Sequence, residues 1–195
     1  RRVLFRSWIG TAAGLDAWRT GDGPPQRRHV GVDEGIDDTG ILTLYHDAGN
    51  NLWVGTELDG LKWLDPASQR FVGYNNIPLD RHSLSDNQVS SVLVDRTGTL
   101  WVGTQFSGVN RTDLASGGFG SFTLLPAESG GRMATPSRKI RAIAAGANGR
   151  LWLGTTGSGL IRLEPISGRA ERIRHDPTQP GSLPDDIVTA VLPGR

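Results

Sequence analysis

Short apolar stretches of strand-like length alternate along this chain with turns rich in glycine, asparagine and aspartate. Apolar segments begin at Ile41, Val89 and Ile140, and each is followed by a four-residue turn and then by a segment that contains a tryptophan. No stretch repeats its apolar residues with the period of an amphipathic helix. The pattern predicts an all-β protein made of short strands joined by tight turns.

The tryptophan segments are copies of one tetrapeptide, Trp-hydrophobe-Gly-Thr. It occurs at residues 8–11, 53–56, 101–104 and 152–155, with spacings of 45, 48 and 51 residues. Strand-like repeats with a period of about 40 to 50 residues are typical of β-propeller blades, each made of four strands. We therefore predict a β-propeller.

Aligning the repeats on the tryptophan predicts four antiparallel strands in each blade. The inner strands are expected at 41–45, 89–94 and 140–145, and the tryptophan strands at 52–56, 100–104 and 151–155. The third strands are expected to begin at 60–61, 108–109 and 159–160. An outer strand follows each of them, as at 70–74. Residues 74–89 also align without gaps to residues 173–188, so that 188–192 is predicted to be the inner strand of a further blade. The chain then holds about four blades, an open fragment of a closed ring.

Composition is that of a turn-rich soluble protein, with 36% hydrophobic and 21% charged residues, 27 Gly and 11 Pro. Cysteine is absent, which excludes disulfides and thiolate metal sites but does not identify a compartment. No apolar run reaches the roughly 18 residues of a membrane span. Arginine accounts for all the basic residues except Lys62 and Lys139, and they form no basic cluster interleaved with aromatics. Nucleic acid is therefore not an expected partner.

The first seven residues, Arg-Arg-Val-Leu-Phe-Arg-Ser, are the translation of a common sequencing-adapter read, AGACGTGTGCTCTTCCGATCT. We interpret residues 1–7 as adapter-derived and residues 8–195 as propeller repeats. Without these seven residues the chain has 18 basic and 20 acidic residues, so even its weak positive charge disappears.

The full motif of the blades is an apolar inner strand, then Asp-x-x-Gly-x-Leu-Trp-x-Gly-Thr, Gly-Leu, Asp-Pro and a later Ser-Leu connection. It resembles the two-component regulator propeller repeat over residues 8–192; Asp95, Gly98 and Trp101 are among the matches in one blade. Departures from the repeat are Gly146 in place of Asp, Thr112 in place of an aromatic residue or Leu, and the connection 124–136, which lacks Ser-Leu.

The resemblance implies a sensor. Such repeats usually form seven-bladed propellers outside the bacterial inner membrane, followed by a β-sandwich, a membrane helix and a histidine kinase or, in other members, a diguanylate cyclase. It implies that this segment is periplasmic, is not itself an enzyme, and needs no cofactor or metal. The implied partners are a small molecule or oligosaccharide ligand, the other blades of the parent chain, and a second copy of the parent in a homodimer.

Candidate ligand residues follow from the blade geometry. In a propeller, the connection between blades and the loop between the second and third strands emerge on one face, where loops vary without disturbing the blades. The ligand-binding candidates there are Asn75, Asn76, Asp80, Arg81, His82, Gln105 and Phe106, with Glu57, Asp59 and Thr156 as further loop residues. Phe106 is the most informative, because an aromatic residue in a loop has no blade core to bury it.

Other conspicuous residues have structural interpretations. The recurring tryptophans are expected to pack between blades rather than form a sugar platform, and the acidic residues of 33–38 are expected in a solvated turn. Residues 154–159 lack the lysine of a phosphate loop, and the four histidines have no metal-ligand spacing. Two alternatives to a sensor remain: a propeller lyase resembling the streptogramin-inactivating enzymes, whose repeat favours Phe-Thr after the tryptophan, and a protein-docking scaffold.

Overall fold

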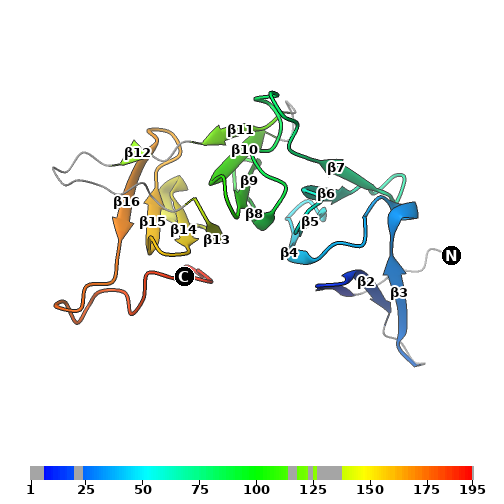
Figure 1. Ribbon diagram of the computed structural model, residues 1–195, viewed down its shortest axis with the longest axis horizontal. Helices are drawn as coiled ribbons and strands as arrows, with labels where there is room; N and C mark the ends of the chain where they lie inside the picture. The colour runs from blue at the N-terminus through cyan, green and yellow to red at the C-terminus, as the bar shows by residue number, and fades with distance from the viewer. Residues whose placement is uncertain (1–6, 20–23, 114–117, 123–124, 127–137, 195) are drawn as a thin grey trace.

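The computed structural model describes residues 7–19, 24–113, 118–122, 125–126 and 138–194. Over these residues the chain forms four mainly antiparallel sheets, arranged one after another along an arc (Figure 1). The strands β4, β8 and β13 lie on the concave side of the arc, and β7, β11 and β16 lie on its outer side. The predicted all-β fold with propeller blades is confirmed.

The strands follow one another in chain order within each blade, from the concave side outward. The first sheet holds β1 (Ser7–Thr11), β2 (Gly14–Arg19) and β3 (Gln26–Val30). The second holds β4 (Ile41–His46), β5 (Leu52–Thr56), β6 (Leu61–Leu64) and β7 (Phe71–Tyr74). The third holds β8 (Val89–Val94), β9 (Thr99–Thr104), β10 (Val109–Asp113) and β11 (Gly120–Phe122). The fourth holds β13 (Ile140–Ala145), β14 (Leu151–Thr155), β15 (Leu160–Leu163) and β16 (Arg169–Ile173), and short 3-10 turns lie at Val32–Glu34 and Ala147–Gly149.

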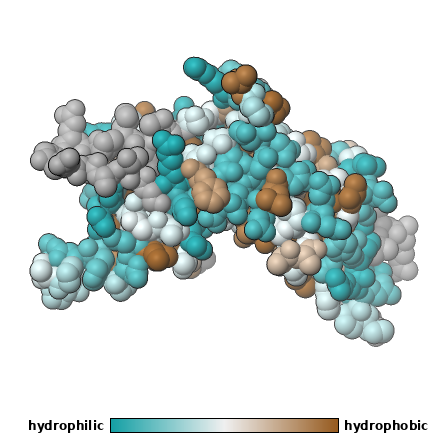
Figure 2. Space-filling model, viewed as in Figure 1, coloured by the Kyte–Doolittle hydropathy of each residue, from teal (hydrophilic) through white to brown (hydrophobic). Residues whose placement is uncertain are grey.

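The hydrophobic core lies between neighbouring blades. Three clusters fill the three interfaces; the central one joins Trp53 and Leu61 of the second sheet to Val92 and Leu100 of the third. Trp53 and Trp101 are buried and Trp8 packs against the first cluster, which confirms the packing role for these three, whereas Trp152 is only half-buried. The face shown in Figure 2 is mainly hydrophilic, with hydrophobic residues in separate spots.

The glycine of the repeated tetrapeptide lets consecutive blades approach each other. A Cβ added at Gly55 would lie 2.6 Å from the carbonyl oxygen of Val89, the first residue of the next inner strand. A Cβ at Gly103 would lie 2.7 Å from Cγ2 of Ile140, the first residue of the inner strand after that. The repeat therefore requires glycine here because the next blade occupies the space of a side chain.

Two features of the chain differ from the predicted strands. Residues 188–192, expected to form an inner strand, have no regular secondary structure, because no strand among the described residues pairs with them in a ladder. Val188 nevertheless packs against Gly154 as Val89 does against Gly55, and its N–H donates to the oxygen of Thr155. A short strand that was not predicted, β12 (Leu125–Pro126), pairs in parallel with β16 at the outer edge of the fourth sheet. Most of the long connection 124–136 lies outside the described residues.

An aspartate in the first hairpin turn holds the tryptophan of its own blade. The Asp95 carboxylate accepts hydrogen bonds from Trp101 Nε1 at 2.7 Å, from Thr97 N at 2.8 Å and from Thr99 N at 3.1 Å. Asp47 accepts from Trp53 Nε1 at 3.1 Å in the same way. In the fourth blade Gly146 takes this position, so the tryptophan there has no equivalent carboxylate. Burial works to raise the pKa of Asp95, but hydrogen bonds from Thr97 and Trp101 outweigh it and leave the pKa below its usual value.

We expect Asp95→Asn to destabilise the protein at pH 7 and to matter much less near pH 3. Because the folded-state pKa of Asp95 is depressed, the stability it contributes is present above its unfolded pKa of 3.8 and is lost as the pH falls through the folded value. Urea denaturation of the wild type and the variant between pH 3 and pH 7 checks this. A difference in unfolding free energy that does not change with pH would contradict it.

Candidate functional site

The loops between second and third strands and the connections between blades lie on one face, as expected. Within a blade, each loop bonds to the residues that precede the inner strand: Glu57 N donates to Gly40 O, and Gln105 N donates to Gln88 O. The same loop reaches the next blade, since Gly108 N donates to Arg138 O at 2.9 Å. We call this side the loop face. Its backbone is held by hydrogen bonds, so its side chains are free to vary between blades.

The two connections aligned in sequence have the same hydrogen bonds. In the first connection, Asn76 N donates to Asn87 Oδ1 and Asn76 Nδ2 donates to Leu84 O. In the second, the equivalent His175 N donates to Asp186 Oδ1, and His175 Nδ1 lies 2.7 Å from Leu183 O. Ser83 and Ser182 bind the turn in matching ways. The serine is thus a turn residue, and the gapless alignment is correct in three dimensions.

Several of the predicted ligand residues maintain the shape of this connection. Asn75 Nδ2 donates to Asp59 Oδ1 at 3.2 Å, and Asn76 makes the bonds described above. Asp80 Oδ1 accepts the N–H of His82 at 2.8 Å. These polar groups already have partners within the protein, so a ligand would have to compete for them.

The structure divides the remaining candidates between two places. The oxygen of His82 accepts a hydrogen bond from Phe119 N, just before the outer strand β11, and Arg81 beside it is exposed. Gln105 and Phe106 instead contact Gln88 and Asp86, where the inner strand β8 begins. Gln105 and Phe106 therefore form one candidate site at the inner end of the loop face.

Phe106 presents its ring to solvent at this inner end. The side chain is 57% exposed, while its N–H donates to Asp86 Oδ2 at 3.0 Å and holds the loop in place. The ammonium of Lys139 lies 5.3 Å from the centre of the Phe106 ring, a cation–π distance. Leu58, at the equivalent position of the preceding blade, is also exposed.

The ammonium of Lys139 adjoins this ring, and Lys139 is one of three cationic residues close together in the sequence, which sequence analysis missed as a group. Arg138, Lys139 and Arg141 stand at the start of β13, whereas the equivalent residues of the second and third blades, 39, 40, 42 and 87, 88, 90, are all uncharged. Arg141 Nε donates to Thr156 Oγ1 at 2.8 Å. The basic rim, defined as Phe106, Arg138, Lys139 and Arg141, joins residues more than thirty positions apart in the chain. A comparison of equivalent positions could have found the cations, but not the ring beside them.

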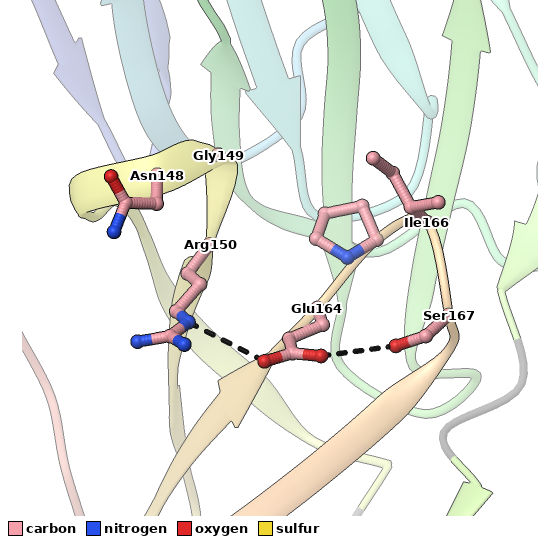
Figure 3. A pocket seen from close by; sticks show the side chains of 7 residues that line it. Asn148, Gly149, Arg150, Glu164, Ile166 and Ser167 are labelled. Carbon is pink, nitrogen blue, oxygen red and sulfur yellow. Dashed lines mark hydrogen bonds and ion pairs between the residues drawn. The ribbon is translucent and has the colours of Figure 1, made fainter.

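A small cleft lies on the opposite face of the fourth blade (Figure 3). Its volume is about 310 Å³, and it opens between the β13–β14 turn and the β15–β16 turn. Arg150 Nε lies 3.4 Å from Glu164 Oε1, and Ser167 Oγ donates to Glu164 Oε2 at 3.2 Å. The polar side chains that line the cleft thus pair mainly with one another.

A polar cluster that sequence analysis did not identify lies on the first sheet. The imidazole of His29 is 3.1 Å from Asp16 Oδ1 and 3.0 Å from Asp38 Oδ1, and Arg27 Nε is 3.0 Å from Asp16 Oδ2. Asp38 belongs to the acidic turn at 33–38. One carboxylate of this turn therefore has a protein partner, whereas the turn was expected to be solvated. Hydrogen bonds to Asp38 and Asp16 raise the pKa of His29. Among the described residues, no acidic and histidine side chains are grouped as metal ligands.

The contribution of His29 to stability is expected to fall as the pH rises. Its raised pKa means that this contribution is complete below the unfolded pKa of about 6.5 and is lost as the pH rises through the folded value. Urea denaturation of the wild type and His29→Gln at pH 5.5, 7 and 8.5 provides the check. The difference between them should be largest at pH 5.5; an equal difference at all three values would contradict the ion pairs.

Comparison with known proteins finds a family model that matches two segments of the chain. Residues 83–106 and 135–157 match the two component regulator propeller family. The extracellular domain of the putative hybrid two component system BT4673 from B. thetaiotaomicron superposes with a TM-score of 0.73 and 25% identity, over 95% of this chain and 23% of that one. That of BT3049 gives 0.68 and 22%, over 86% of this chain and 23% of that one. No curated protein matches the chain.

The chain thus spans less than a quarter of the length of these extracellular domains. Virginiamycin B lyase from Staphylococcus aureus shares the fold alone, with a TM-score of 0.59 and 14% identity over 90% of this chain and 53% of the lyase. Within the described residues, no helix is both long and apolar enough to pass through a bilayer. Taken with the repeated tryptophan strands and their hairpin aspartates, the match shows two-component regulator propeller repeats at residues 83–106 and 135–157.

Proposed function

We propose that this chain is part of the extracytoplasmic ligand-sensing propeller of a two-component sensor histidine kinase. The observation that supports this most is its likeness, over 95% of its length, to the extracellular domain of a putative hybrid two component system. The proposed location is the periplasm, as part of an inner-membrane protein. In this proposal the phosphotransfer chemistry belongs to another part of the parent, and this segment binds a ligand or transmits its binding.

The structure of the blades is consistent with such a division of labour. Repeated positions such as Trp101 and Gly103 are committed to packing between sheets, whereas the loop face differs from blade to blade. A small molecule or an oligosaccharide is the proposed ligand, and a homodimer is the proposed state of the parent. The lyase alternative is supported by the fold alone, since identity to the lyase is 14%.

The complete reading frame of the parent gene tests the proposal. We expect it to continue into a membrane-spanning segment and a histidine kinase domain, and we expect the purified parent in membrane vesicles to autophosphorylate. A reading frame that ends after about seven blades, without a membrane span, would contradict the proposal. Release of an eliminated product from a streptogramin substrate would instead identify a lyase.

A further inference from the structure

The geometry points to a binding site for a ring-bearing carboxylate at the basic rim. In this site the ring of the ligand packs on Phe106, and its carboxylate lies among Arg138, Lys139 and Arg141. The inference rests on the proposed function, in which the loop face is the sensing face, and it names the chemical class of the ligand.

Exposure of Phe106 is the first observation. Exposing an aromatic side chain of this size to water is unfavourable. Phe106 is nevertheless 57% exposed, at the tip of a loop whose backbone is held by hydrogen bonds. The N–H of Gln105 donates to Gln88 O at 3.0 Å and that of Phe106 to Asp86 Oδ2 at 3.0 Å. The loop therefore presents a preformed aromatic surface, which costs little ordering entropy when a ligand binds.

The departure of the rim from the repeat is the second observation. Three of the four residues 138–141 are cations, while the equivalent positions of the other whole blades carry none. Packing within the blade does not require them, because Gln88 and Gly40 occupy the place of Lys139 in neighbouring blades. Like charges at neighbouring positions repel one another, and a bound anion would offset this repulsion.

Arg141 stands at an irregular position of its strand. The pairing register of β13 with β14 shifts between Ile140 and Ala142, so that Arg141 occupies a β-bulge. Leu42 and Ser90 occupy the same bulge in the second and third blades, so the bulge belongs to the repeat, and the cationic side chain is what differs in the fourth blade. The Nε of Arg141 is anchored to Thr156 Oγ1, which leaves the two terminal nitrogens of the guanidinium as donors for a carboxylate.

Neighbouring acidic groups are already engaged. Asp86 accepts the N–H groups of Phe106 and Gln88, and Asp186 pairs with Arg174 on the next connection. Among the ion pairs between described residues, none includes Arg138 or Arg141. The rim therefore combines an apolar aromatic surface with donors suited to a carboxylate, and one ligand that carries both a ring and a carboxylate satisfies both.

Titration calorimetry of the chain with three probes tests the inference. Trigalacturonate carries its carboxylates on sugar rings, benzoate carries one on an aromatic ring, and galactotriose is a neutral control. We expect one of the two carboxylates to bind, more weakly at high salt, and galactotriose not to bind. The carboxylate that binds distinguishes a sugar acid from an aromatic acid as the source of the shared chemistry.

Variants place the binding at the rim. Lys139→Gln and Arg141→Gln should each weaken binding by about tenfold or more, and Phe106→Leu, which copies the leucine of the preceding blade, should weaken it as well. Arg150→Gln removes a cation from the cleft on the opposite face and should leave binding unchanged. Unchanged thermal midpoints show that each variant remains folded.

The inference is overturned if neither carboxylate binds, if galactotriose binds as well as trigalacturonate, or if only Arg150→Gln weakens binding, which would place the ligand in the opposite cleft. These results leave the proposed function intact when the parent's kinase activity responds to another ligand. The absence of a kinase domain in the parent gene would instead reject the proposed function without affecting the titration.

Discussion

Replacing Gly55 by alanine is expected to destabilise the protein by about 3 kcal/mol, because the added methyl group has no space between the second and third blades. Its Cβ would lie 2.5 Å from Thr43 Cγ2, 2.8 Å from Val89 Cγ1 and 2.6 Å from the oxygen of Val89. The first two atoms can move with their side chains, but the third belongs to the backbone of the next inner strand. Relief of the contact therefore requires the blades to separate and to loosen the core around Trp53 and Val92.

Gly181→Ala is the matched control for this variant. Gly181 lies on the connection between β16 and residue 188, it has no atom within 4 Å of an added Cβ, and its φ is not positive. Its substitution should change the free energy of unfolding by no more than about 0.5 kcal/mol. Urea denaturation followed by tryptophan fluorescence measures both. Equal stability of Gly55→Ala and Gly181→Ala would show that the blades are not in close contact at the repeated glycine.

Asp59→Ala is expected to cost about 3 kcal/mol, because it leaves the ammonium of Lys62 buried without a counter-charge. Lys62 Nζ lies 2.6 Å from Asp59 Oδ2, and the two side chains are only 8% and 18% exposed. Asp59 also accepts a hydrogen bond from Asn75, which holds the start of the connection to the third blade. The variant thus removes both a buried ion pair and a link between the loop and that connection.

Two controls show how much of the destabilisation comes from the uncompensated charge of Lys62. In the double variant Asp59→Ala with Lys62→Met no charge is buried, so it should be more stable than Asp59→Ala alone. Glu171→Ala breaks the Arg162–Glu171 pair, whose side chains are 36% and 53% exposed, and should cost less than about 1 kcal/mol. Chemical denaturation of the wild type, Asp59→Ala, Lys62→Met and the double variant gives the double-mutant cycle. A double variant less stable than Asp59→Ala would contradict the role of the uncompensated charge.

Much of the blade architecture could be predicted from the sequence, because repetition samples the same local physics several times. The strands around Trp53 and Trp101 and the turn at Ser83 fall where the repeat places them. The predicted strand at 188–192 is not formed, and β12 was not predicted, because a strand exists only with a partner and the partner is a matter of tertiary structure.

The candidate site was less accessible to prediction. Phe106 could be selected as an exposed loop aromatic, and it is exposed. Asn75 and Asn76 have the composition of ligand-binding residues, but their amides are used by the connection itself. The proximity of Lys139 to Phe106 arises from the packing of two successive blades, and no local pattern in the sequence encodes it.

Hydrogen–deuterium exchange of the chain, alone and with the carboxylate probe that binds, tests the central claim that the repeated strands are packing elements and that ligands act at the loop face. Strands β5, β9 and β14 are predicted to exchange slowest and to be unaffected by the probe, while protection increases at residues 105–108 and 138–141. Protection that increases instead in the tryptophan strands, or at the cleft residues 148–150 and 164–167, would contradict the account.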